Sequence, residues 1–407
     1  MDYVINDQNH VIKGIDRGET ASFLGIRFAR GERFKKPVLE PLAKEVDATR
    51  RGDGCPQFRQ FFDESKSKSK QDIFYYDEFR KGMTFRHSED CLNLNVYAPK
   101  NAQNLPVLLY IHGGAFVICS SDERPFDGTE IAKEGVICVT ANYRLNVFGY
   151  NADEGAQNLA FYDMICAIEW IKANISVFGG DPSSITLMGQ SAGAMSIQTL
   201  ICSDMLKGKV KGAVMLSGGG KRGAILPISK PNVAYWNKLV KASGAQSFAE
   251  FKNLDAKTVW TTWKTKFPLG KALCTKPVID GELVKDKRYD TDIPIVLGTV
   301  KKDLLPPVLN HMARAFARGQ KKKNAPCYVF SLPHLLPPDD ASFHSCDLWY
   351  VLGSLGKSPR PFTKADCELS DEIVDRMAEF ARSQNPNIKG KEDWKTYSSK
   401  KDIKVFE

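Results

Sequence analysis

Short apolar runs along the chain alternate with longer segments that carry a helical pattern. The runs are too short for helices and are bounded by turn residues, so they predict buried strands. They cover residues 105–111, 135–140, 185–188, 210–216, 293–297 and 327–331. Helices are predicted over residues 159–174 and 192–201. Strands alternating with helices form a mostly parallel sheet covered on both faces. Because no linker interrupts the pattern, we expect one α/β domain.

Composition and charge indicate an ordinary soluble protein. The chain has 407 residues, of which 26% are charged, and a formal net charge of +9. Its densest basic cluster, Lys321–Lys323, has no interleaved stacking aromatics, so nucleic-acid binding is not indicated. No apolar stretch is long enough to span a bilayer, and we therefore expect no membrane partner.

The N-terminus and the cysteines bear on the cellular compartment. The first residues have neither the basic start nor the apolar core of a secretory signal, so we expect a cytoplasmic protein, with secretion as the open alternative. The ten cysteines are too scattered for a disulfide scaffold. Cys138, Cys166 and Cys202 lie within apolar runs and are interpreted as buried small side chains. No histidine and cysteine residues have the spacing of zinc ligands, so no metal or cofactor is expected.

A nucleophile elbow is the main chemical motif. Residues 189–193 have the sequence GQSAG, directly after the predicted strand 185–188 and at the start of the predicted helix 192–201. A G-x-S-x-G turn in this context lifts the serine to the carboxyl end of the sheet, and glycines on either side allow strand and helix to approach closely. Ser191 is therefore the candidate nucleophile.

A glycine loop is the second motif. Residues 112–115, with the sequence HGGA, directly follow the predicted strand 105–111. In hydrolases with such an elbow, this loop and the residue after the nucleophile donate backbone N–H groups to the oxyanion. Gly113, Gly114 and Ala192 are the candidate donors, and the ring of His112 is interpreted as structural.

The general base and its acid are assigned by chain order. The expected order is serine, acid, histidine, which leaves three late histidines: His311, His334 and His344. A loop-to-helix context favours His344. The acid must follow a late strand, and Asp303 follows the predicted strand 293–297. The competing carboxylates precede that strand: Asp280, Asp290 and Asp292.

Together these motifs resemble the type-B carboxylesterase family, which includes cholinesterases, lipases and bacterial p-nitrobenzyl-type esterases. Similar segments extend over nearly the whole chain: FLGIRFA at 23–29, EDCLNLNV at 89–96, NYR at 142–144 and FGGDP at 178–182. The resemblance implies an α/β-hydrolase fold, with a mostly parallel central sheet, helices on both faces and an N-terminal antiparallel portion. It also implies the triad Ser191, Asp303 and His344, with Ser217 as a buried serine that supports the acid.

The chain departs from the family pattern at several positions. Asp303 lies where the family commonly has glutamate, and Gln190 lies where it usually has another glutamate, beside the nucleophile. A neutral Gln190 weakens the case for cationic, choline-like substrates. Only 41 residues separate Asp303 from His344, so a deep lidded gorge is not expected. Cys55 and Cys91 match a disulfide of secreted members, and in a cytoplasmic protein we expect them as neighbouring reduced thiols.

The combined prediction is a serine hydrolase that cleaves small, neutral carboxylic esters through an acyl-enzyme. A single domain would cover residues 1–407, with a reduced lid and substrate-pocket region around 220–290 and 305–340. Four residues are candidates for substrate contact, although the aromatic ones fit a core role equally well: Phe116, Gln190, Phe343 and Trp349. The alternatives are a feruloyl or acetyl esterase acting on plant polysaccharide, a lipase, an amidase, or a non-catalytic binding member of the family.

Overall fold

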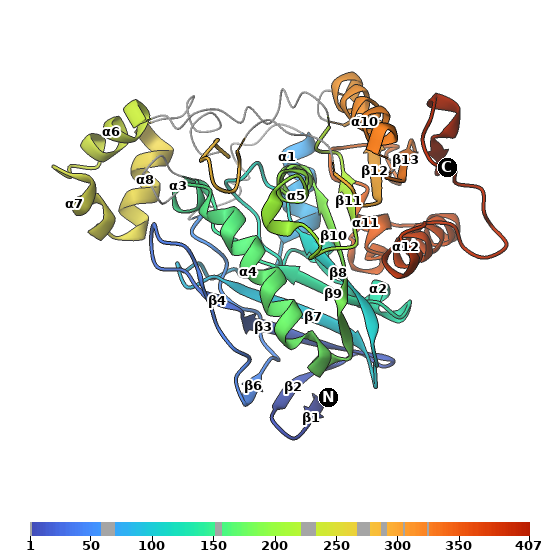
Figure 1. Cartoon of the computed structure of the whole chain (residues 1–407), viewed down its shortest axis with the longest axis horizontal. Coiled ribbons are helices and arrows are strands. Elements are labelled where there is room, and N and C mark those ends of the chain that lie inside the picture. The colour runs from blue at the N-terminus through green and yellow to red at the C-terminus, as the bar shows by residue number, and fades with distance from the viewer. Residues whose placement is uncertain are drawn as a thin grey trace.

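The computed structural model describes residues 2–57, 70–150, 157–220, 233–266, 277–285, 291–303, 306–323 and 325–407. A twelve-stranded sheet runs through these residues in the order β1-β2-β3-β7-β9-β8-β10-β11-β12-β13-β14, with β6 paired to β2 (Figure 1). Pairing is antiparallel from β1 to β9 along this path and parallel from β9 to β14. The expected mostly parallel sheet with an antiparallel N-terminal portion is confirmed.

The strands vary widely in length. Their bounds are β1 Asp2–Asn6, β2 Val11–Asp16, β3 Thr20–Arg27, β6 Glu45–Asp47, β7 Asn93–Pro99, β8 Leu105–Ile111, β9 Ile137–Ala141, β10 Gly180–Gln190, β11 Gly212–Leu216, β12 Ile295–Val300, β13 Cys327–Leu332 and β14 Lys404–Val405. A separate two-stranded sheet joins β4 Ala29–Arg30 to β5 Val38–Leu39.

Helices cover both faces of the sheet, because its central strands bury both sets of alternating side chains. In β8, Val107 and Leu109 belong to one apolar cluster, whereas Leu108 and Tyr110 belong to the other. The first cluster includes side chains of three helices: α4 Leu159–Asn174, α5 Ala192–Ile201 and α10 Pro306–Gln320. The second includes side chains of α2 Thr129–Lys133, α11 Leu348–Val351 and α12 Lys364–Ser383. No helix among the described residues is long and apolar enough to cross a membrane.

A third apolar cluster lies at one end of the molecule. It joins α6 Val233–Ala242, α7 Phe248–Asn253 and α8 Ala256–Lys266 to Phe34 and Phe148 of the main body (yellow helices in Figure 1). These helices fall within the first part of the expected lid region. The second part, around 305–340, contains α10 and the sheet strand β13, so much of it belongs to the core of the fold.

The other helices among the described residues are short. They are α1 Lys70–Phe74, the π-helical turn η1 Tyr75–Arg80, α3 Asn146–Gly149 and six 3₁₀ turns: η2 Arg124–Phe126, η3 Ile175–Phe178, η4 Asp204–Leu206, η5 Lys321–Lys323, η6 Leu355–Lys357 and η7 Lys400–Asp402. The sequence pattern located the strands and helices around the elbow to within a few residues. Both predicted helices have the observed bounds, and the short predicted strand 185–188 is the end of a longer strand, β10.

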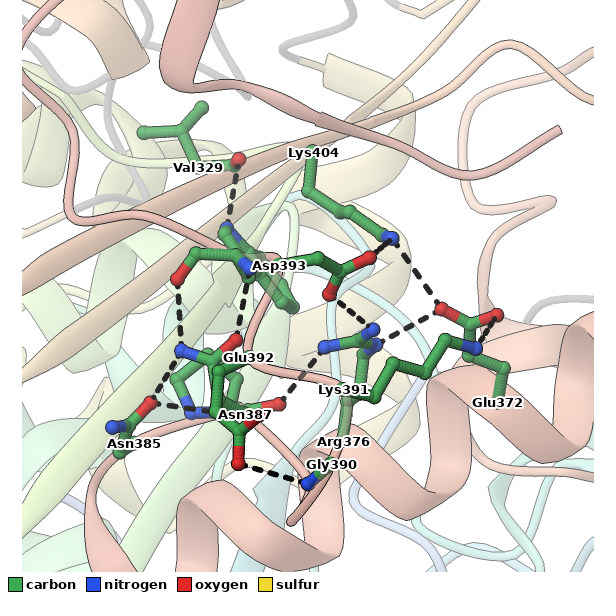
Figure 2. A network of polar contacts seen from close by, with 12 residues as sticks. Val329, Glu372, Arg376, Asn385, Asn387, Gly390, Lys391, Glu392, Asp393 and Lys404 are labelled. Carbon is green, nitrogen blue, oxygen red and sulfur yellow. Dashed lines mark hydrogen bonds and ion pairs between the residues drawn. The ribbon is translucent and has the colours of Figure 1, made fainter.

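A polar network holds the C-terminal segment against α12 (Figure 2). Its centre is the fully buried Arg376, which donates to Glu372 at 3.0 Å, to Asp393 at 2.6 Å and to the carbonyl of Pro386 at 3.3 Å. Lys404 of β14 bonds to the same Asp393 at 2.5 Å. The network therefore links a central helix of the second cluster to the last strand of the sheet.

Removing this buried guanidinium is expected to destabilise the fold without changing the chemistry. We predict that Arg376→Ala lowers the free energy of unfolding by about 2–4 kcal/mol, because two carboxylates lose a buried partner. This loss of stability is at the lower end of the range typical for breaking a buried ion pair, because Lys404 still pairs with Asp393 and Lys391 still pairs with Glu372. Urea denaturation measures the change.

Arg382→Ala is the matched control on the same helix. Arg382 is more exposed and pairs with Glu379 at the surface, so its loss should cost less than about 1 kcal/mol. Equal losses for the two variants would contradict a structural role for the Arg376 network.

Candidate active site

Ser191 lies in a strained turn between β10 and α5. Its backbone has φ 55° and ψ −122°, a combination that non-glycine residues rarely adopt. A Cβ atom on Gly193 would lie 2.1 Å from the carbonyl oxygen of Ile111, and one on Gly189 would lie 2.9 Å from it. Only glycines therefore allow the elbow to press against the end of β8.

The glycine loop lies beside this elbow because β8 and β10 are neighbours in the sheet. A Cβ atom on Gly113 would lie 2.8 Å from the Gln190 carbonyl oxygen and 3.2 Å from Ser191 Cβ. Gly114 has a φ of 98°, and a Cβ there would lie 2.0 Å from the carbonyl oxygen of Ile118. The structure thus places Gly113 against the candidate nucleophile, with no room for a side chain.

Tyr143 holds His112, the first residue of the glycine loop, in place. The His112 ring stacks on Tyr143 with 4.4 Å between ring centres, and the Tyr143 hydroxyl donates to the His112 carbonyl at 2.8 Å. Burial lowers the pKa of His112 to about 4, so the ring is neutral near pH 7. This position agrees with a structural role for the ring.

Of the three late histidines, His344 is the one paired with Asp303. Its Nδ1 lies 2.5 Å from Asp303 Oδ1, and both side chains are buried. Asp303 follows β12 and His344 follows β13, and these strands are neighbours. His334 instead contacts Asp366 at 2.7 Å, whereas His311 lies exposed on α10.

The competing carboxylates lie elsewhere. Asp280 accepts a hydrogen bond from Asn158 at 2.7 Å, Asp292 is exposed just before β12, and Asp290 falls outside the described residues. Of the candidate acids that the structure describes, Asp303 is therefore the one that contacts His344.

Gln190 contacts the other nitrogen of the same ring. Gln190 Nε2 lies 3.2 Å from His344 Nε2, and the glutamine side chain is buried beside Gly113. The Ser191 hydroxyl makes no hydrogen bond with the described part of the chain. The sequence placed Gln190 next to the nucleophile but gave no sign that it would also contact the base.

Ser217 does not support the acid as expected. Its hydroxyl is buried and has no hydrogen-bond partner among the described residues. Its backbone N–H instead donates to the carbonyl of Gly298 at 2.8 Å, which joins the end of β11 to β12. The expected hydroxyl–carboxylate bond is therefore absent from the described structure.

Asp347 is a buried residue that the sequence patterns did not single out. It lies three residues after His344 with no exposed surface, and within the described residues its two carboxyl oxygens have no hydrogen-bond partner. Burial, followed by the nearby charge of Asp303, raises the pKa of Asp347 to about 8. Asp347 is thus a neutral acid at pH 7, close to the candidate triad. The sequence signal that could have identified Asp347 was an acidic residue three positions after the candidate base His344.

This raised pKa predicts a pH-dependent stability. Between its ordinary pKa of 3.8 and about 8, Asp347 stays protonated in the folded protein and ionised in the unfolded chain, so it lowers stability as pH rises. Relative to wild type, Asp347→Asn should therefore gain up to about 1.4 kcal/mol per pH unit between pH 5 and 7.5. Urea denaturation at both pH values measures the gain, with the exposed Asp292→Asn as control. A difference that does not vary with pH would contradict the raised pKa.

The candidate pocket aromatics have different surroundings. Phe116 packs edge-on against Tyr150, and the half-buried Phe343 stacks on Phe74 with 4.9 Å between ring centres. Trp349 has no exposed surface and packs against Phe79 in the second core cluster. This position favours the core interpretation of Trp349, and Phe116 is likewise buried in the first core cluster, which leaves the half-buried Phe343 as the aromatic candidate for substrate contact.

Cys55 and Cys91 form a disulfide in the structure, with their Cα atoms 4.9 Å apart. The two cysteines are neighbours, as expected, but they are bonded rather than reduced, the state that we expected only for a cytoplasmic protein. The disulfide anchors a segment in which Gln57 bonds to both the backbone N–H (2.9 Å) and the carbonyl (2.7 Å) of Cys119. It thus fastens the chain that follows the glycine loop.

A strained serine between strand and helix, a close glycine loop and a buried histidine–aspartate pair define a serine hydrolase of the α/β-hydrolase fold. The chain belongs to the carboxylesterase family, whose model matches residues 5–314 and 306–407. Its activity class is carboxylic-ester hydrolysis.

Individual relatives agree with this assignment. The para-nitrobenzyl esterase of Bacillus subtilis (strain 168) is 30% identical over 97% of this chain and 92% of its own length. The acylcarnitine hydrolase of Mus musculus is 26% identical over 92% of this chain and 81% of its own. A solved structure of a PNB esterase superposes with a TM-score of 0.78 at 25% identity, covering 95% of this chain and 91% of that one.

Proposed function

We propose that Ser191 is the nucleophile, His344 its general base and Asp303 the acid that orients the base. His344 Nε2 takes the Ser191 proton as the hydroxyl oxygen attacks the ester carbonyl. The backbone N–H groups of Gly113, Gly114 and Ala192 receive the oxyanion. Protonated His344 then gives its proton to the departing alcohol, which leaves an acyl-enzyme.

Hydrolysis of the acyl-enzyme uses the same groups. His344 removes a proton from water, the resulting hydroxide attacks the acyl carbonyl, and collapse releases the carboxylic acid and restores Ser191. Asp303 keeps Nδ1 of the ring protonated, so that Nε2 faces the reacting atoms in both steps. The 2.5 Å contact between His344 and Asp303 carries this proposal, since it directs one buried imidazole toward the elbow.

Nε2 of His344 must exchange partners before the first step. In the structure it contacts the Gln190 amide, which is next to Ser191 in the chain. Catalytic hydrogen bonds are often incomplete without substrate. The Gln190 amide therefore has to release Nε2 so that the Ser191 hydroxyl can donate to it.

The proposed substrates are small, neutral carboxylic esters. Gln190, directly before the candidate nucleophile, is neutral where the family usually has a glutamate, so it supplies no negative charge for a cationic substrate. A panel tests this proposal: p-nitrophenyl esters of increasing acyl length, acetylthiocholine, a feruloyl ester and an anilide. We expect the highest kcat/KM on short neutral acyl esters, and a preference for the choline ester or the anilide would contradict it.

Replacing Gln190 with glutamate should shift the substrate preference toward cationic esters. A carboxylate within reach of the imidazole stabilises its protonated form, so the acidic limb of the kcat/KM profile should move upward by roughly one pH unit. The same charge should improve the cationic-to-neutral ester ratio of kcat/KM about tenfold. Gln190→Met, which has a similar shape and no charge, is the control. An unchanged ratio in Gln190→Glu would remove Gln190 from the specificity determinants.

Two alternatives are separated by the same panel. A feruloyl or acetyl esterase acting on plant polysaccharide would favour the feruloyl ester or acetylated polysaccharide. A non-catalytic binding member of the family would show no turnover on any substrate. The buried His344–Asp303 pair and the intact elbow favour the enzyme.

A cytoplasmic location remains a prediction from the N-terminal sequence. The Cys55–Cys91 disulfide is a feature of oxidising compartments, and so argues for the alternative of secretion. Cell fractionation, with alkylation and mass measurement of the protein before and after reduction, decides between them. The cytoplasmic prediction requires Cys55 and Cys91 to be alkylated without prior reduction.

A further inference from the structure

A pocket that none of the proposed catalytic residues lines lies between α10, the strands β12 and β13, and the C-terminal segment. Its volume is about 360 Å3, which suits one small molecule. Eight residues line it: Thr299, Asn310, Ala313, Arg314, Val329, Phe330, Ser331 and Ile403. None of them belongs to the proposed triad or the glycine loop, so the pocket is separate from the ester site.

Arg314 gives this pocket an uncompensated positive charge. The residue is half-buried, and its guanidinium has no hydrogen bond or ion pair with any part of the chain that the structure describes. Five other buried or half-buried arginines differ, because each of them pairs with a carboxylate: Arg33, Arg80, Arg144, Arg360 and Arg376. No aspartate or glutamate lines the pocket. Its charge therefore favours an anion.

Hydroxyl and amide groups complete the polar part of the lining. The Ser331 hydroxyl is half-buried and makes no hydrogen bond within the described residues, so it can donate to a ligand. Thr299 donates to Asn310 Oδ1 at 2.7 Å, which ties β12 to α10. The bond fixes β12 relative to α10, and these two elements form two sides of the pocket.

Apolar side chains form the rest of the lining. Ala313, Val329, Phe330 and Ile403 contribute to it, and the Phe330 side chain is fully buried. A wall that is half apolar does not suit inorganic phosphate or another fully hydrated anion. It suits a planar carboxylate, which arginine binds through two parallel hydrogen bonds, attached to a short apolar group.

The helix that carries Arg314 is also where the two matched pieces of the family model overlap. The family model matches in two pieces, residues 5–314 and 306–407, which meet on α10. The B. subtilis relative aligns over 469 positions with a chain of 407 residues, so the alignment contains gaps in this chain.

We propose that this pocket is a second ligand site, for a small carboxylate with an apolar group, held by Arg314 and Ser331. The proposal does not depend on the ester chemistry, because no catalytic residue lines the site. The chemical class includes the short-chain and aromatic carboxylic acids that ester hydrolysis releases. Asp303 lies only four residues after Thr299, so a bound ligand would lie against the strand that leads to the proposed acid.

Calorimetric titration of the full-length protein with benzoate tests the proposal. Wild-type protein should bind benzoate, and Arg314→Gln should weaken the binding at least tenfold, because a charge-assisted pair is lost. Arg318→Gln is the matched control, since Arg318 lies exposed on the same helix and does not line the pocket. Benzamide, a neutral analogue of the same shape, should bind at least tenfold more weakly than benzoate.

Both arginine variants leave the ester site unaltered, so the difference between them isolates the second pocket. Equal benzoate affinity in Arg314→Gln and Arg318→Gln, or no binding to wild type, would overturn the proposal. So would inorganic phosphate displacing benzoate at equal concentration, because the apolar wall would then have no role. Melting temperatures of the variants without ligand exclude misfolding as the cause of a loss.

Discussion

Replacing Ser191 with alanine is expected to lower kcat for p-nitrophenyl acetate by roughly a million-fold, with little change in stability. The reason is that the oxygen that forms the acyl-enzyme is removed, while the strained turn and the glycine loop remain. Weak hydrolysis above the solution rate should persist, because oxyanion donors act without the nucleophile. A stopped assay with purified enzyme, checked by a matching thermal melt, measures the loss.

Ser196→Ala is the matched control for this experiment. Ser196 lies on the same helix, and its buried hydroxyl donates to the Ala192 carbonyl at 2.8 Å without a proposed catalytic role. This variant should keep most of the activity. If Ser191→Ala hydrolysed the ester as fast as Ser196→Ala, another group would have to be the nucleophile.

Replacing Asp303 with asparagine should lower kcat by roughly ten-thousand-fold. An amide keeps the volume of the carboxylate, but it favours the wrong tautomer of His344 and no longer stabilises the protonated ring. Both partners are buried, so solvent does not replace the lost charge. Stopped-flow kinetics across pH 6–9 would show whether the loss persists at every pH, as a change of tautomer requires.

Asp292→Asn is the matched control, because Asp292 is the competing carboxylate that lies nearest to Asp303 in the sequence. Asp292 is exposed just before β12, so its replacement should leave kcat within about twofold. If Asp303→Asn kept most of its activity, the role of the acid would move to another carboxylate. The buried Asp347, close to Asp303 in the fold, would then be the first to test.

The sequence predicted the local structure of the elbow well, because neighbouring residues determine it. The elbow needs one strand, one turn and one helix within about fifteen residues, and apolar spacing with two glycines specifies all three. Asp303 and His344 were assigned from the chain order serine, acid, histidine, from the strand that precedes Asp303, and from the family pattern.

Contacts between distant segments could not be predicted in this way. The approach of Gln190 to His344 joins residues 154 positions apart, and depends on how two loops pack. The neutral state of Asp347 depends on complete burial, which spacing alone does not reveal. The full burial of Arg376 likewise depends on a distant part of the chain, because the C-terminal segment folds over it.

The disulfide was misjudged for a different reason. Its two positions were recognised through the family resemblance, but their redox state was inferred from the expected compartment rather than from geometry. Tertiary structure brings Cys55 to Cys91, just before β7, and the bond between them closes a loop of 36 residues. Restricting such a loop in the unfolded chain typically stabilises a protein by a few kcal/mol.

Identification of the covalent intermediate tests the central claim most directly. The protein would be mixed with a p-nitrophenyl phosphonate, digested with a protease and analysed by mass spectrometry for the modified residue. The proposed mechanism predicts one phosphonyl group per chain, attached to Ser191, with loss of activity in proportion to labelling. Labelling of a different residue, or full labelling of Ser191 with activity retained, would contradict it.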